Sequence, residues 1–162
     1  MNIFVLDDNP KLAAQYHCDK HVVKMILETA QIVSTVLVQM DTKFKKDFYK
    51  PTHPTHPCVI WAGKAEYNFW WLLHLGFYLS REFTYRYGGK HKSSEIIKLA
   101  ANIFTYDSSL EFPETLITPF VQAMPEYCKD PDDAVNAYRT YYIMEKKHLL
   151  TYTKRPKPLW LG

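Results

Sequence analysis

Five polar side chains recur at helical spacing near the N-terminus. His17, His21, Lys24, Glu28 and Gln31 follow one another at steps of four, three, four and three residues. On an α-helix these side chains lie along one line, while Val, Met and Ile fill most of the other positions. Because an unpaired Lys or Glu is costly to bury, we predict that the line forms the floor of a functional cleft. The alternative is a partly exposed edge stabilised by a Lys24–Glu28 pair.

His17 and His21 also have the spacing of a two-histidine metal site. Further nitrogen and sulfur ligands are available at His53, His56 and Cys58. However, zinc proteases place a glutamate directly after the first histidine, and Cys18 stands there instead. We therefore predict no metal and no other cofactor, with a metal-dependent hydrolase as an alternative. On a helix Cys18 turns about 100° away from His17, which favours a buried structural cysteine over a nucleophile.

Composition predicts one folded domain spanning residues 1–162. Of the 162 residues, 47% are apolar and 15% aromatic, which suffices for one well-packed core and is short for two. Three cysteines without CxxC spacing fit a reducing compartment. No secretory signal is apparent, and His74 and Gly76 interrupt the apolar run 69–79, so we expect no membrane span and a cytoplasmic location.

The balance of 20 Lys and Arg against 17 Asp and Glu is only mildly basic. The basic residues nevertheless gather in three segments, at 43–50, 81–92 and 154–157. Together these segments could contact a phosphate backbone, although solvated loops give the same pattern. Arg81 and Arg86, near the end of an aromatic-rich helix, are the best candidates for contact with anions.

Proline and glycine divide the chain into helices and loops. We predict helices over about 10–40, 59–87, 93–104 and 130–150, separated by proline-rich loops at 41–57 and 106–129. Asn9-Pro10 supplies an N-cap and a first-turn proline, and Gly88-Gly89 supplies a stop. The expected fold is mainly α, a single compact domain in which the two long helices pack together.

Residues 19–28 (DKHVVKMILE) resemble a helix of the pyrimidine-dimer DNA glycosylase and AP-lyase family of phages and bacteria, the endonuclease V type. In that helix a histidine precedes the catalytic glutamate by seven residues. Tyr49 with His56-Pro57 is similar to a loop of bacterial members, and residues 79–88 to one of their helix ends. Arg155-Pro156 with Trp160 and Gly162 is similar to their C-terminal tail. These four segments follow one another in the same order as in the family. Uncharacterised phage proteins also have a string similar to HCDKHVVKM.

The resemblance implies a DNA N-glycosylase, with AP-lyase activity, that acts on a damaged or modified pyrimidine. The Met1 amine would attack C1′ of the nucleotide and form a Schiff base. Glu28 would be the catalytic carboxylate, and His21 its neighbouring histidine. Substrate contacts are assigned to His17, Lys24, His56, Arg81, Arg86 and Arg155. The implied partner is duplex DNA, in the cytoplasm of a bacterium or a phage-infected host, and the oligomeric state stays open.

The chain departs from the family pattern at two positions. Asn2 predicts that Met1 is retained, whereas the best-known members expose a small second residue, and Leu27 stands where an arginine precedes the glutamate. Glu28 could instead activate a water molecule. A second function class is a non-catalytic phage protein that binds a nucleotide-like ligand in the same cleft. If the amine is the nucleophile, residues 1–6 must fold back and place it within several ångströms of Glu28, with His21 nearby.

Overall fold

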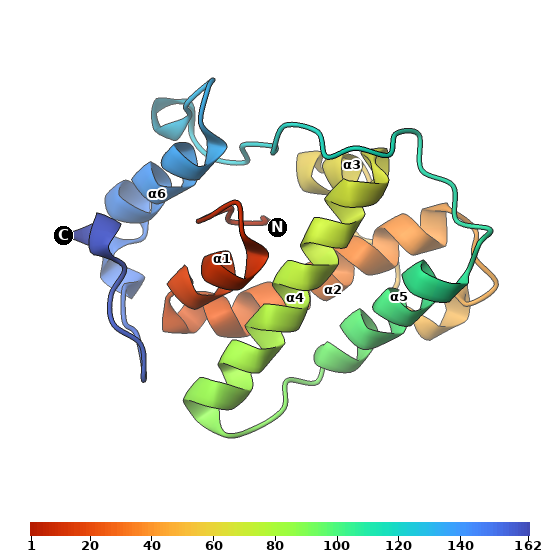
Figure 1. Ribbon diagram of the computed structural model, residues 1–162, viewed down its shortest axis with the longest axis horizontal. Helices are drawn as coiled ribbons and strands as arrows, with labels where there is room; N and C mark the ends of the chain where they lie inside the picture. Colours follow the sequence, from red (N-terminus) through yellow and green to blue (C-terminus); the bar gives the residue numbers. More distant parts are fainter.

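The computed structural model describes residues 1–162 and confirms the mainly α fold (Figure 1). The helices are α1 (Pro10–Tyr16), α2 (Asp19–Gln39), α3 (Pro57–Lys64), α4 (Glu66–Tyr87), α5 (Ser94–Tyr106) and α6 (Ala134–Glu145). Short 3-10 turns lie at Lys45–Asp47, Glu126–Cys128, Lys147–Leu149 and Leu159–Leu161. There is no strand, and the single β-type contact is an isolated bridge between Ala65 and Glu114.

The predicted 10–40 helix is in fact two helices. Its start is as predicted, because the Asn9 side chain accepts hydrogen bonds from the backbone N–H groups of Lys11 and Leu12. The helix then ends at Tyr16, and His17 and Cys18 are extended before α2 begins. The break frees the backbone carbonyls of Gln15 and His17, which accept hydrogen bonds from Arg86 instead of from the next helical turn.

The predicted 59–87 helix is also interrupted. Ala65 has φ −139° and ψ 146°, an extended conformation between α3 and α4. Backbone hydrogen bonds to the proline-rich segment replace those of a continuous helix at this point: Glu66 donates to Glu114, and Glu114 donates to Lys64. The end of α4 follows the prediction, because Gly88 is left-handed with φ 78° and its N–H donates to the carbonyl of Thr84.

The last long helix is shorter than predicted. It begins at Ala134, with Asp133 as the N-cap, because the Asp130 carboxylate is occupied in the preceding turn. Asp130 accepts the backbone N–H groups of Asp132 and Asp133 and the amide of Asn136. Helix α5 begins at Ser94, one residue after the predicted start, and the N-cap residue Ser93 makes no side-chain capping hydrogen bond.

Helix α2 forms the centre of the domain and packs against α3, α4 and α5, as the prediction of two packed long helices requires (Figure 1). The buried apolar side chains form one contiguous cluster, consistent with a single domain. At Gly76 a Cβ atom would lie 2.7 Å from the methyl group of Thr29 and 2.9 Å from Ile97, so glycine permits the close approach of α4 to its neighbours. The aromatic run of α4 is only partly core, since Tyr67, Trp70 and Phe77 are exposed.

By length and composition alone, α2 is apolar enough to cross a membrane. However, 72% of its most apolar window is buried inside the domain. That burial is typical of the core helix of a folded protein, and the domain is compatible with a soluble protein.

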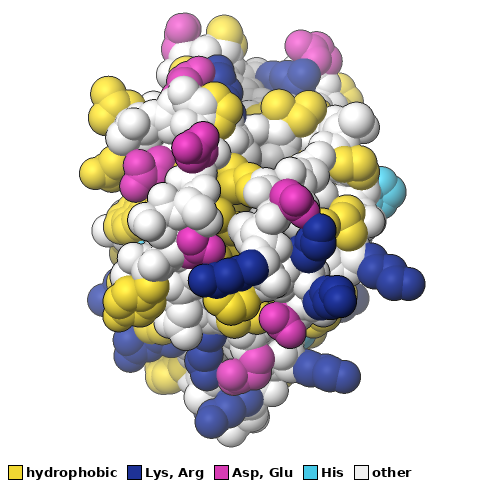
Figure 2. Space-filling view, turned by 90° about the vertical axis from the view of Figure 1, so that its right-hand side faces the viewer, with side chains coloured by type: hydrophobic (Ala, Val, Ile, Leu, Met, Phe, Trp, Pro, Cys, Tyr) yellow, Lys and Arg dark blue, Asp and Glu magenta, His cyan; other side chains and the backbone are white.

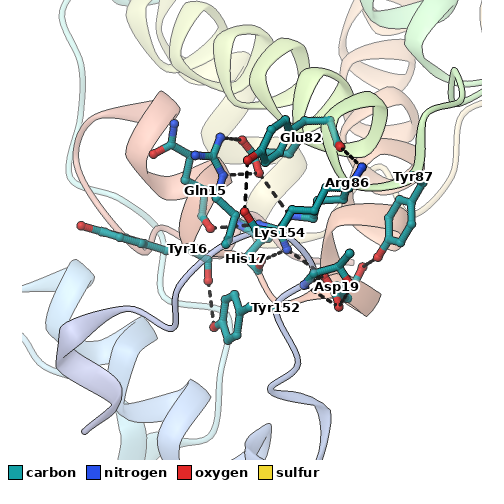
Figure 3. A network of polar contacts seen from close by, with 12 residues as sticks. Gln15, Tyr16, His17, Asp19, Glu82, Arg86, Tyr87, Tyr152 and Lys154 are labelled. Atoms are coloured by element: carbon teal, nitrogen blue, oxygen red, sulfur yellow. Dashed lines mark hydrogen bonds and ion pairs between the residues drawn. The ribbon is translucent and has the colours of Figure 1, made fainter.

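The break between α1 and α2 is held by Arg86, whose side chain is fully buried (Figure 3). Its guanidinium donates to Glu82 Oε2 at 3.1 Å and to Asp19 Oδ1 at 3.0 Å. It also donates to the carbonyls of His17 at 2.9 Å and Gln15 at 3.0 Å. Burial raises the pKa of Asp19, but hydrogen bonds from Thr153 and Arg86 outweigh it and hold that pKa below its ordinary value.

We expect Arg86→Met to lower the free energy of unfolding by about 3–5 kcal/mol, because the variant leaves the carbonyls of Gln15 and His17 without a donor and removes the cation that pairs with Glu82 and Asp19. Arg86→Lys should recover little of this loss, since an ammonium cannot reproduce the planar fork. The matched control is Arg81→Met on the exposed side of the same helix, which should change stability by less than about 0.5 kcal/mol. Urea denaturation measures both variants, and equal losses would contradict the structural role of Arg86.

Candidate functional site

The N-terminal arm, residues 1–6, lies inside the protein. Ile3, Val5 and Leu6 are fully buried. Asn2 fixes the arm from both sides: its side-chain oxygen accepts the Ile3 N–H at 2.7 Å, and its amide donates to the carbonyl of Ala123 at 2.8 Å. Phe4 has φ 34°, an uncommon conformation for a bulky residue. Burial of its neighbours therefore holds the arm in a strained backbone conformation.

This arm places the α-amine of Met1 beside Glu28. The amine nitrogen lies 3.9 Å from Glu28 Oε2, which also accepts the backbone N–H of Asn2 at 2.8 Å. The Glu28 side chain is only 10% exposed, so the carboxylate is partly shielded from water. The prediction that the arm folds back and brings the amine within several ångströms of Glu28 is confirmed.

Two further polar side chains lie near this pair. Lys24 Nζ is 3.4 Å from Glu28 Oε1, and the Lys24 side chain is otherwise largely exposed. His56 caps α3, since its Nδ1 accepts the backbone N–H of Cys58 at 3.1 Å, which leaves the proton of the neutral ring on Nε2. Burial, followed by the positive charge of the N-terminal amine, lowers the pKa of His56, while Glu28 opposes the shift. His56 therefore lies within electrostatic range of both groups.

His21 of α2 is buried against another part of the arm, at Phe4. Its Nδ1 forms a 2.6 Å hydrogen bond with the Tyr142 hydroxyl, and its ring lies 4.5 Å from the Phe4 ring, between centroids. No hydrogen bond or ion pair joins His21 to Glu28 or to the amine. Burial, then the charges of His17, Lys146 and Lys24, lower the pKa of His21 to about 3. The ring is thus neutral and supports the arm through Phe4.

His17 does not line a cleft, which corrects its assignment as a substrate contact. It is fully buried, and its Nδ1 donates to the Ala13 carbonyl at 2.7 Å, while Nε2 has no partner. Burial lowers its pKa to about 4. The helix break before α2 leaves His17 outside the helix that carries His21, Lys24 and Glu28, although the two histidine rings lie only 6.5 Å apart between centroids. Phe4 of the arm packs on both rings, so His17 lines no open cleft. The Lys24–Glu28 pair of the alternative reading does form.

The basic candidates separate into two groups. Arg86 is not available to a substrate, because its guanidinium is buried and hydrogen-bonded within the protein, and its assignment to phosphate binding is wrong. Arg81 lies on the surface of α4, 5.9 Å from the Phe77 ring. Arg155 makes a bidentate contact with Glu82 and lies 4.5 Å from the Tyr85 ring. Arg81 and Arg155 share a cleft that is separate from the amine.

The cysteines are structural in character. Cys18, Cys58 and Cys128 are all buried and unpaired. Burial raises the pKa of Cys18, which disfavours the reactive thiolate, as the sequence predicted. No group of three or more His, Cys, Asp or Glu side chains is placed to hold a metal ion.

Two positioning residues escaped the sequence analysis. Asn2 anchors the arm, and Arg139 of α6 donates to the Leu6 carbonyl at 3.0 Å and pairs with Asp7 at 3.3 Å. Arg139 is more than 130 positions from the arm. No local pattern in the sequence indicates so distant a contact.

Comparisons with protein-family models, curated proteins and solved structures gave no match for this chain. The resemblance of residues 19–28 to the glycosylase family therefore stays a hypothesis from the sequence.

Protonation of the buried histidines should make stability depend on pH. Their pKa values of about 4 and about 3 lie below the ordinary 6.5, so below pH 6.5 the unfolded chain binds protons first. The contribution of the two neutral histidines to the free energy of unfolding is therefore complete above pH 6.5 and is lost as the pH falls towards 4. Each histidine should remove about 2 kcal/mol from the free energy of unfolding between pH 7 and 5.

Urea denaturation of His21→Gln at both pH values tests this expectation. In His21→Gln the free energy of unfolding should fall less between pH 7 and 5 than in the wild type, because the contribution of His21 is absent. In His148→Gln, which replaces an exposed histidine, it should fall as much as in the wild type. An unchanged dependence in His21→Gln would show that the folded protein protonates this ring as easily as the unfolded chain does.

Proposed function

We propose that this protein is a DNA N-glycosylase with AP-lyase activity, which cleaves the bond between base and sugar at a damaged or modified pyrimidine. The observation that carries the proposal is the 3.9 Å separation of the Met1 amine from the Glu28 carboxylate. An amine is nucleophilic only when neutral, and a neighbouring carboxylate can accept its proton. The resemblance of residues 19–28 to the glycosylase helix supports the same pair of residues.

The reaction follows from this pair. The neutral amine forms a bond to C1′ of the sugar, and the glycosidic C–N bond breaks as the base departs with the electron pair and takes up a proton. The attacking amine gives one proton, through Glu28, to the departing base. The C1′–O4′ bond then breaks, O4′ takes up a proton from water, and a protonated Schiff base (iminium) remains between the amine nitrogen and C1′. Glu28 stabilises the cation and later removes a proton from C2′, so that β-elimination expels the 3′-phosphate.

The target nucleotide must leave the duplex to reach a partly buried amine. Lys24 is exposed beside Glu28, and His56 carries its proton on Nε2. Both are therefore suited to contact the phosphate or the sugar of the extruded nucleotide. His21 acts as a positioning residue in this proposal, because it packs on Phe4 of the arm.

The first test is Glu28→Gln in single-turnover assays on duplex DNA containing a pyrimidine dimer or an abasic site. We expect the rate to fall by about 100-fold or more, while DNA affinity stays within a few fold, because the carboxylate handles protons and does not hold DNA. Glu126→Gln is the control, since the Glu126 side chain is 87% exposed and far along the chain. Wild-type rates in Glu28→Gln would exclude this carboxylate from the reaction.

The second test moves the amine. Adding Gly-Ser before Met1 displaces the nucleophile, so borohydride should no longer trap a covalent adduct with abasic DNA, whereas Gly-Ser added after Gly162 should leave trapping unchanged. Peptide mass analysis of the wild-type adduct identifies the amine that reacted. Undiminished trapping by the extended chain would rule out the N-terminal amine. Activity without any trapped adduct would favour a water molecule activated by Glu28.

A further inference from the structure

A basic cleft lies between α4 and α5, apart from the amine and Glu28. Its volume is about 770 Å³, within the range typical of small-molecule sites. Its walls come from α1, the second half of α4, the first two thirds of α5, and Arg155. Figure 2 views the side of the molecule on which α5 lies, and Lys and Arg side chains are concentrated in its lower half, towards the end of α4. Neither Met1 nor Glu28 lines the cleft.

The cleft has an unbalanced charge. Five cationic side chains line it: Lys11, Arg81, Lys90, Lys98 and Arg155. The two lining carboxylates are Glu82 and Glu95, which gives the lining a formal charge of +3. The net charge of the whole chain is also +3, so the rest of the protein is balanced. The lining of this cleft thus carries a positive charge equal to the net charge of the whole chain, which suits an anion.

Both carboxylates already have partners. Glu82 binds Arg86 and Arg155, and Glu95 pairs with Lys98 at 2.8 Å. Three cations, Lys11, Arg81 and Lys90, remain without a carboxylate. These three side chains are exposed in the cleft, so a phosphate group bound there could accept hydrogen bonds from several of them.

Aromatic rings stand beside these cations. Phe77 and Tyr85 line the cleft and are 45% and 49% exposed. Tyr85 already packs against the guanidinium of Arg155, and Phe77 against that of Arg81. Polar groups for hydrogen bonding are supplied by Ser80, Ser94 and Asn102. Exposed rings next to unpaired cations are the combination that binds a base and its phosphate.

We propose that the α4–α5 cleft is a binding site for a nucleoside phosphate, either free or as one unit of a single strand. Lys11, Arg81 and Lys90 hold the phosphate, and the base stacks on Phe77 or Tyr85. Because the catalytic pair does not line the cleft, this site stands independently of the proposed glycosylase activity.

Binding of dTMP, measured by calorimetry, and of a fluorescein-labelled octathymidylate, measured by anisotropy, tests the proposal at low salt. The variant Arg81→Glu/Lys90→Glu should weaken binding about tenfold or more, because two phosphate contacts become repulsive. The matched control Lys20→Glu/Lys147→Glu makes the same change in net charge at exposed lysines outside the cleft, and should weaken binding less than threefold. Thermal melting verifies that each variant is folded.

If the wild-type protein binds dTMP and the cleft variant does not, the site binds free nucleotides. If the wild-type protein binds only the octamer, and the cleft variant loses that binding, the site binds a single strand. Both outcomes support the proposal. Equal losses in the cleft variant and the control would overturn it, because only net charge would then matter, and so would the absence of binding by either probe. Glu28→Gln should leave the affinity for dTMP within twofold. A large loss there would place the nucleotide at the amine and contradict the proposed site.

Discussion

Burial of the Arg86 guanidinium is the constraint on which the rest of the structure depends. A guanidinium inside a protein needs acceptors for its donors, and the chain supplies two carboxylates and two backbone carbonyls. The carbonyls of Gln15 and His17 are free only because the helix breaks between α1 and α2. The break lets α1 turn back against α4, and the arm before α1 then enters the core beside α2. Arg86 thereby positions Met1 without touching it.

The candidate site needs a terminus that does not fray. Most chain ends are mobile, but here apolar burial, the Asn2 side chain and the Arg139–Asp7 pair hold the arm at three points. The left-handed Phe4 costs of the order of 1–3 kcal/mol, which this packing must offset. A nucleophile held in one place reacts more readily than one on a flexible tail, because the entropy of positioning it is lost on folding and not in the reaction.

Features that depend on neighbouring residues could be predicted from the sequence. The Asn9-Pro10 start and the Gly88 stop follow from the local chemistry of caps and backbone angles, and the mainly α fold from the helical spacing of polar and apolar residues. The breaks at 17–18 and at Ala65 could not, because their hydrogen-bond partners, Arg86 and Glu114, are distant in the chain. Since periodicity continues through the first break, the pattern placed His17 on the same line as His21. The structure buries both histidines against Phe4 of the arm, which no local pattern predicts.

Arg81 and Arg86 show that a sequence reveals which side chains are charged more easily than whether a charged side chain stabilises the fold or binds a ligand. They lie five residues apart on α4, and five steps of about 100° turn the second side chain roughly 140° from the first. Arg86 therefore faces α1 and is neutralised by the acceptors around it, whereas Arg81 faces the cleft and has no carboxylate partner. The number of acceptors within reach, and not the residue type, decides which arginine holds the fold together and which is free to bind an anion.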